Sequence, residues 1–338
     1  LLSFFVLQQV SAQKIRLKVE DQKDTTVFLI KYFGSKLFYA DTAQMKNGEV
    51  IFDGAKQKPG IVGLFLPGQR YFEFVYNNEE IQLETKGPDF MGNMVIKKSE
   101  ENKIFIPYVK FISSKKGEIA KLSEQRSKLK PEDEAYKNLG TQIDALNKEV
   151  EAYQANLVAA NPGKLVSKIV QMSTEVVVPE PPKDDKGKVL DSNFRYKYYF
   201  AHYWDNVDFK TDALVNNPIF ANKLEFYFGK QMMIQHWDTI IKYAFKFCDA
   251  LDPKSKIFCA AISEWKNWTC ATCEVDRKAV WSADYLWSDR RIPSSIGAGS
   301  VYPYYSIRQS KSKASTQVCP SEWEIGKNRS CWLRDIGK

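Results

Sequence analysis

The sequence predicts an α+β multidomain protein, in which an N-terminal antiparallel β-sandwich or partial barrel is followed by an all-helical domain with a long helix hairpin. Three observations lead to this fold class. Short runs of alternating apolar and polar residues fill residues 13–98, apolar residues recur at helical steps over 99–257, and neither period continues through 258–338. A chain of 338 residues, 44% of them hydrophobic, can form two or three domains with their own cores. We expect the tail, 258–338, to be irregular, poorly structured and rich in Cys, Trp and Ser.

The N-terminal stretch LLSFFVLQQVSA is apolar over its first seven positions, turns polar at Gln8 and ends in small residues. This order is typical of the hydrophobic and cleavage regions of a secretory signal peptide, so we interpret residues 1–12 as the remnant of one. The alternative is an ordinary buried N-terminal strand. The stretch is too short to span a bilayer, and no cysteine follows it that could carry a lipid. We therefore expect an exported, cleaved product.

Residues 13–98 have the pattern of a β-domain. Ile15, Leu17 and Val19 alternate with charged residues, and further short apolar runs follow, each bounded by a turn sequence such as Asn47-Gly48. About seven short strands at hairpin spacing favour an antiparallel sandwich or partial barrel. This part of the sequence holds no histidine and no cysteine. We therefore expect it to provide an adaptor or docking surface and not a catalytic site.

From Ser99 the apolar residues recur at the period of an α-helix, which predicts a helical domain over 99–257. Its first part, 99–160, has the pattern of an antiparallel hairpin of two long helices, with Pro131 in the first turn of the second helix. The alternative is a pair of core helices in a compact bundle. The second helix carries a heptad stripe typical of a coiled-coil seam, formed by Tyr136, Leu139, Ile143, Leu146, Val150, Tyr153 and Leu157.

A linker and a set of aromatic helices complete the helical domain. The linker, 174–192, contains three prolines and a charged, glycine-containing run, so it is expected to be extended and exposed. Over 193–250 we expect aromatic helices joined by an acidic loop. So many rings in one run predict that most of them are buried against neighbouring helices: Phe194, Tyr196, Tyr198, Tyr199, Phe200, Tyr203 and Trp204.

Several phrases of the sequence resemble a known family. They are FAHYWDNVDF and NPIFANKLEFYF, followed by Asp238-Thr239-Ile240-Ile241, with Asp41-Thr42-Ala43 and Ile51-Phe52-Asp53-Gly54 in the β-domain. They resemble the β-domain and the helical middle domain, both of unknown function, of envelope TlpA-like thiol–disulfide oxidoreductases. The resemblance covers residues 14–257. It implies the periplasm or cell envelope of a diderm bacterium, a substrate- or partner-docking role, and envelope proteins or thiol and disulfide substrates as partners.

In that family a thioredoxin domain with a C-x-x-C pair follows, and here Cys270 and Cys273 have this spacing. Such a pair needs a helix N-terminus, where the dipole lowers the pKa of the first thiol. The surroundings depart from the family, because the preceding AAISEWKN is no apolar strand and only a short tail remains. We therefore expect an accessory portion without a working redox site, with an active disulfide reductase that uses Cys270 and Cys273 as the alternative. A thioredoxin domain scrambled by a frame disruption would explain the tail.

Other sites have weaker support in the sequence. His202 with Asp205 and Asp208 could form an acid–base set, but we expect both histidines, His202 and His236, to lie in the aromatic core. A second C-x-x-C is missing, so we expect no metal, and we expect no cofactor. The net charge is +8 without a recognised nucleic-acid module, so no nucleic acid is expected as a partner. An envelope module that binds peptide or glycan is a further alternative, for which the sequence shows no clustered, exposed aromatic triad.

Overall fold

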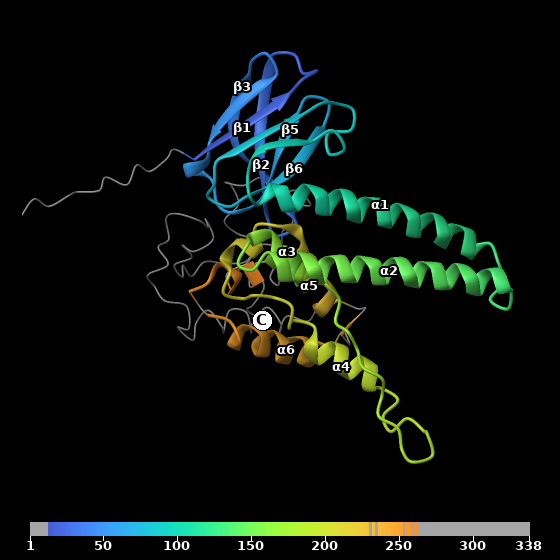
Figure 1. Cartoon of the computed structure of the whole chain (residues 1–338). Coiled ribbons are helices and arrows are strands. Elements are labelled where there is room, and N and C mark those ends of the chain that lie inside the picture. Colours follow the sequence, from blue (N-terminus) through green and yellow to red (C-terminus); the bar gives the residue numbers. More distant parts are fainter. Residues whose placement is uncertain (1–12, 230–231, 234–235, 253, 259, 262–338) are drawn as a thin grey trace, which may run out of the picture. The chain divides into compact units, whose positions relative to one another are not determined.

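The computed structural model describes residues 13–229, 232–233, 236–252, 254–258 and 260–261 (Figure 1). Within them, two four-stranded β-sheets come first and helices follow, as the α+β prediction states. The interpreted signal peptide, 1–12, and nearly all of the tail predicted to be irregular lie outside the described residues. No helix in these ranges is both long enough and apolar enough to cross a membrane.

The β-domain contains eight strands in two sheets, close to the number predicted. All strand pairs are antiparallel except β1 with β7, which corrects the expectation of a purely antiparallel domain. Between these two strands the chain builds the whole of the other sheet, and such a long connection can return to β1 in the parallel direction. Sheet A has the order β4 (Glu49–Asp53), β1 (Lys14–Val19), β7 (Ile81–Thr85), β8 (Val95–Lys98), and sheet B the order β3 (Lys36–Met45), β2 (Thr25–Phe33), β5 (Gly60–Leu66), β6 (Arg70–Tyr76).

The core of the β-domain follows the predicted alternation. Ile15, Leu17 and Val19 are at most 2% exposed, and Val27 and Leu29 of β2 are fully buried. The turn at Asn47-Gly48 has positive φ angles of 50° and 75°, the conformation that joins two strands directly and that this dipeptide tolerates. The short helix η1 (Gly54–Lys56) leads from β4 towards β5.

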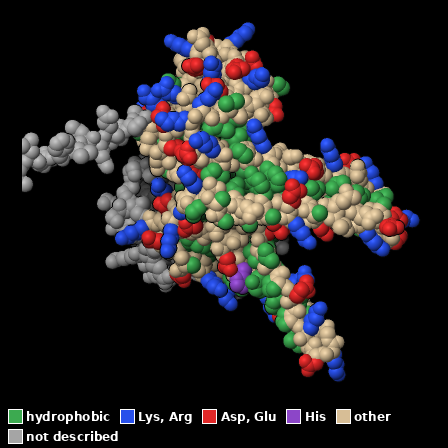
Figure 2. Space-filling view, in the orientation of Figure 1, with side chains coloured by type: hydrophobic (Ala, Val, Ile, Leu, Met, Phe, Trp, Pro, Cys, Tyr) green, Lys and Arg blue, Asp and Glu red, His purple; other side chains and the backbone are tan. Residues whose placement is uncertain are grey.

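The long helix hairpin forms as predicted, from α1 (Asn102–Ser127) and α2 (Glu134–Ala160), which pack side by side. The heptad stripe of α2 faces α1, but only Leu157 in it is buried, with 8% of its surface exposed, and the other six positions are half-buried. A hairpin of two helices covers a seam from one side only, whereas a bundle would cover it from several. Figure 2 accordingly shows hydrophobic side chains at the surface along the hairpin.

The remaining elements form the rest of the helical domain. The linker 174–192 is extended and mostly exposed, as predicted, with a single β-bridge between Lys183 and Val189. The helices are α3 (Leu165–Ser173), α4 (Phe194–His202), η2 (Asp212–Val215), α5 (Pro218–Phe228) and α6 (Trp237–Asp249).

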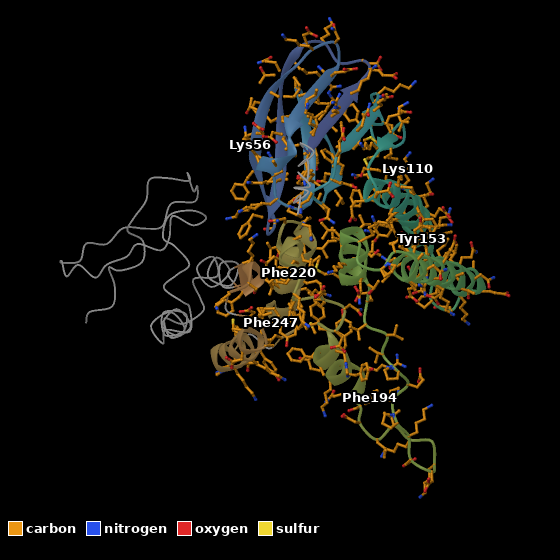
Figure 3. All side chains as sticks on the ribbon, turned by 60° about the vertical axis from the view of Figure 1, so that its left-hand side comes forward. Lys56, Lys110, Tyr153, Phe194, Phe220 and Phe247 are labelled. Carbon is orange, nitrogen blue, oxygen red and sulfur yellow. The ribbon has the colours of Figure 1, made fainter. Side chains whose placement is uncertain are left out.

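The aromatic run is less buried than the sequence predicted. None of the residues of α4 is fully buried, and Tyr196 is 52% exposed. The reason is that α4 packs on one side only: the Phe200 ring lies 4.9 Å from Tyr227 of α5 and 4.7 Å from Tyr243 of α6, and solvent takes the other side. Figure 3 shows Phe220 and Phe247 in the interior of the helical domain and Phe194 on the outlying α4.

Buried polar side chains join the β-domain to the helices. Glu101, only 3% exposed, accepts hydrogen bonds from the backbone N–H groups of Leu165 (3.0 Å) and Val166 (2.9 Å), and so caps the N-terminus of α3. Asn102, fully buried, accepts from the N–H of Val75 (2.8 Å) and donates to its carbonyl (2.7 Å). The first turn of α1 is thereby bound both to strand β6 and to helix α3.

Candidate functional site

The predicted redox pair, Cys270 and Cys273, lies outside the described residues. The cysteine that the structure does describe as a free thiol, Cys248 on α6, is 6% exposed, and burial raises its pKa to about 12. A thiol with so high a pKa is a poor nucleophile near neutral pH, so Cys248 serves packing. The part of the chain that the structure covers also holds no group of three or more His, Cys, Asp or Glu side chains that could hold a metal ion.

The structure separates the residues of the possible acid–base set. His202 Nδ1 lies 2.6 Å from Asp205 Oδ2, whereas Asp208 accepts from the Thr211 hydroxyl (2.7 Å) and pairs with Lys168 (3.0 Å). Burial opposes ionisation of Asp208, but the hydrogen bonds from Thr211 and Lys168 outweigh it and lower the pKa. Asp208 thus holds the turn after α4.

The expectation that both histidines lie in the aromatic core is wrong. The side chain of His202 is 41% exposed and stacks on Tyr198 at 4.1 Å, and His236 is exposed. His202 is exposed because it ends α4, a helix that buries one side only, whereas His236 is the residue that precedes α6. The partners of His202 among the described residues are Asp205 and Tyr198.

A cluster of aromatic side chains lies on the outer face of sheet B. Phe28 of β2 pairs in register with Phe65 of β5, which pairs with Tyr71 of β6, so the three rings share one face. Tyr39 of β3 completes the cluster, with its ring 4.9 Å from Phe28 and 6.2 Å from Phe65. We call these four residues the aromatic patch.

The aromatic patch is open to solvent. Tyr39 is 67% exposed and Tyr71 47%, and Leu37 beside them is 45% exposed. Clustered exposed aromatic side chains are typical of surfaces that bind a partner. The sequence analysis missed this cluster because its members come from four strands. The sequence does contain a signal for the patch. A strand with one face in solvent normally alternates apolar and polar residues, whereas β2 and β5 carry the unbroken apolar runs VFLI and IVGLFL, which place apolar side chains on both faces.

A partly buried acid lies beside the patch on the same face of sheet B. The Tyr32 hydroxyl donates to Glu73 at 2.5 Å, and Ile30 packs over Gly63, whose missing side chain leaves room for it. Burial raises the pKa of Glu73, while the hydrogen bond from Tyr32 acts in the opposite direction. Burial and the neighbouring Glu73 also raise the pKa of Tyr32, so its hydroxyl stays a donor at neutral pH.

The two-sheet domain that carries the patch is a recognised unit. Residues 14–105 match the family model DUF4369, a domain of unknown function. The match spans both sheets and the first residues of α1, and every member of the aromatic patch lies within it. No curated protein and no solved structure matches the chain. The matching residues thus coincide with the two-sheet β-domain, and the family description names no activity.

The acid beside the patch makes the stability of the β-domain depend on pH. Folding raises the pKa of Glu73 above its ordinary value of 4.5. The protonated side chain therefore contributes to the free energy of unfolding below about pH 4.5, and this contribution is lost as the pH rises through the pKa of the folded state. We expect Glu73→Gln to be more stable than the wild type at pH 7, with a difference that shrinks towards pH 4. Urea unfolding at both values measures this, with Glu49→Gln as the exposed control. A difference independent of pH would contradict the expectation.

Proposed function

We propose that this chain is the accessory, partner-docking portion of an exported thiol–disulfide oxidoreductase-like protein of the cell envelope. The observation that carries the docking role is Tyr39, which is 67% exposed above Phe28 and Phe65 on the outer face of sheet B. The buried Cys248 supports a role other than catalysis for the described part of the chain. Export and the oxidoreductase context rest on the signal-peptide-like start and on the resemblance of residues 14–257.

The geometry of the patch favours a polypeptide over a glycan as the partner. Sugar rings stack best on aromatic rings that present a flat platform. Here the ring planes of Phe28 and Tyr39 are inclined by 49°, and those of Tyr39 and Phe65 by 79°. Inclined rings leave notches between them, and such notches receive protruding side chains of a protein partner.

The docking role is tested with an extended polypeptide, the reduced and alkylated B chain of insulin. We expect it to bind the purified protein, and we expect Tyr39→Ala to weaken binding by about tenfold or more, as for an anchor residue of an interface. Ile51→Ala is the matched control, because Ile51 is 53% exposed on the solvent face of β4 in the other sheet. Equal binding by Tyr39→Ala and the wild type, measured by fluorescence anisotropy, would contradict the role of the patch.

The alternative function, a disulfide reductase, makes a different prediction. If the chain is an accessory portion, we expect the wild type and the Cys270→Ser variant to reduce insulin disulfides at the same rate in the presence of dithiothreitol. An active Cys270–Cys273 pair would give turnover that is lost on this substitution, because the thiolate of the first cysteine is the nucleophile. Turnover of the wild type alone would replace the accessory assignment with the reductase.

A further inference from the structure

The two edges of sheet B differ. At the β6 edge, both backbone groups of Val75 are taken by the side chain of Asn102, at 2.8 and 2.7 Å. At the opposite edge, β3 has β2 on one side and no strand on the other within the described ranges. A row of free N–H and C=O groups on an edge strand is a template for pairing with another extended chain. The β6 edge is therefore blocked at Val75, whereas the β3 edge has no strand beside it among the described residues.

The open stretch is the first half of β3. In the second half, the Asp41 side chain accepts the N–H of Thr42 at 2.8 Å, and the ladder with β2 is irregular opposite Leu29 and Ile30. Irregular ladders and local side-chain bonds are devices that block an edge. In the first half, Leu37 and Tyr39 are 45% and 67% exposed, and the described residues show neither a register irregularity nor a local side-chain bond there.

Two lysines lie on or directly beside this open stretch, and a third lies near one of them. Lys36 begins β3, Lys31 is the register partner of Phe38, and Lys58 lies in the turn before β5. None of the three lysines has an ion-pair partner among the residues described. Burial, together with the neighbouring ammonium groups of Lys256 and Lys31, lowers the pKa of Lys58. An acidic group placed here would relieve the repulsion between them.

The open stretch also continues an interface within the chain. The turn before β3 is held to the helical domain, because the N–H of Gly34 donates to the carbonyl of Val215 at 3.0 Å. The start of β5, two strands away in sheet B, is held in the same way: Ile61 donates to the carbonyl of Asn216 at 3.0 Å, and Asn216 donates to the carbonyl of Pro59 at 2.7 Å. The start of β3 is thereby fixed in place, which lowers the ordering cost of binding at this edge.

We propose that the first half of β3 is a strand-addition site, which takes an extended segment of a partner polypeptide whose alternate apolar residues are flanked by carboxylates. The proposal rests on the docking role of the aromatic patch, which lies on the same strand. The backbone of the partner pairs with Leu37 to Tyr39, its apolar side chains on one face meet the patch, and its acidic ends meet Lys31, Lys36 and Lys58. Main-chain pairing supplies affinity and the side-chain pockets supply specificity.

The test compares three blocked heptapeptides: EVTFTVE, the same peptide N-methylated at alternate amides, and KVTFTVK. N-methylation removes the donors of one strand edge and leaves the side chains in place. We expect the first peptide to bind at least about tenfold more tightly than either of the others. Its addition should slow backbone hydrogen exchange in residues 37–39 by a factor of about ten, because strand pairing protects the edge.

Two variants complete the test. Lys31→Gln combined with Lys36→Gln removes the preference for EVTFTVE over KVTFTVK, whereas Lys56→Gln, a lysine paired with Asp53, keeps it. Binding that tolerates N-methylation, or that leaves exchange in 37–39 unchanged, overturns strand addition. Failure of all three peptides to bind also overturns strand addition. In that case, binding of the insulin B chain that is weakened by Tyr39→Ala still supports the docking role. Loss of that dependence as well overturns both.

Discussion

Asn102→Ala lowers the free energy of unfolding by about 2–4 kcal/mol, because it leaves the N–H and the carbonyl of Val75 buried without partners, at about 1–3 kcal/mol for each group. Asn102 is fully buried, and its amide also donates to the Ser99 hydroxyl at 2.8 Å. No other side chain among the observed partners of Val75 can take its place. Urea unfolding followed by tryptophan fluorescence measures the loss.

Two further variants separate this mechanism from a simple loss of volume. Asn102→Asp keeps an acceptor for the N–H of Val75 and loses the donor to its carbonyl, so it should also destabilise, by burying an unpaired charge. Asn193→Ala is the matched control, because Asn193 is exposed and makes no capping bond with its side chain. It should stay within about 0.5 kcal/mol of the wild type. A loss for Asn102→Ala no larger than that for Asn193→Ala would show that the bonds to β6 do not hold the junction.

The second large effect belongs to the interior of the helical domain. Phe220→Ala should cost about 3–5 kcal/mol, the range found when a large buried aromatic side chain is removed and the cavity cannot fully collapse. Phe220 is 0% exposed on α5, and its ring lies 6.3 Å from that of Trp204, which in turn lies 4.7 Å from Phe247 of α6. Three segments of the chain therefore meet around this position, so the loss is expected to loosen the whole helical domain.

Phe226 on the same helix provides the control. Its side chain is 37% exposed and its ring lies 5.9 Å from Tyr203, so Phe226→Ala removes one half-covered contact and should cost about 1 kcal/mol. The shift in urea midpoint of the two variants gives the comparison. Similar shifts would mean that burial in the static structure does not describe the energetic core of this domain.

Much of the fold is readable in the sequence because it depends on neighbours along the chain. The alternation of Ile15, Leu17 and Val19 predicts a strand with one buried face, and the turn at Asn47-Gly48 requires a conformation that few other dipeptides accept. The heptad stripe of α2 predicts the hairpin in the same way. In each case the preference acts over a few residues, so the printed order of residues already contains it.

The parallel pairing of β1 with β7, the exposure of α4 and the aromatic patch depend on contacts between distant segments. The aromatic residues from Phe194 onward would be buried only if neighbouring elements covered both sides of α4. In the fold, α5 and α6 cover one side. Tyr39, Phe28 and Phe65 come together because β3, β2 and β5 are neighbours in sheet B, an order that no local preference states. The sequence by itself determined the strands, the turns and the helices of this protein. Only the tertiary structure decided which apolar faces remain uncovered, because exposure is a property of what packs against a side chain and not of the side chain itself.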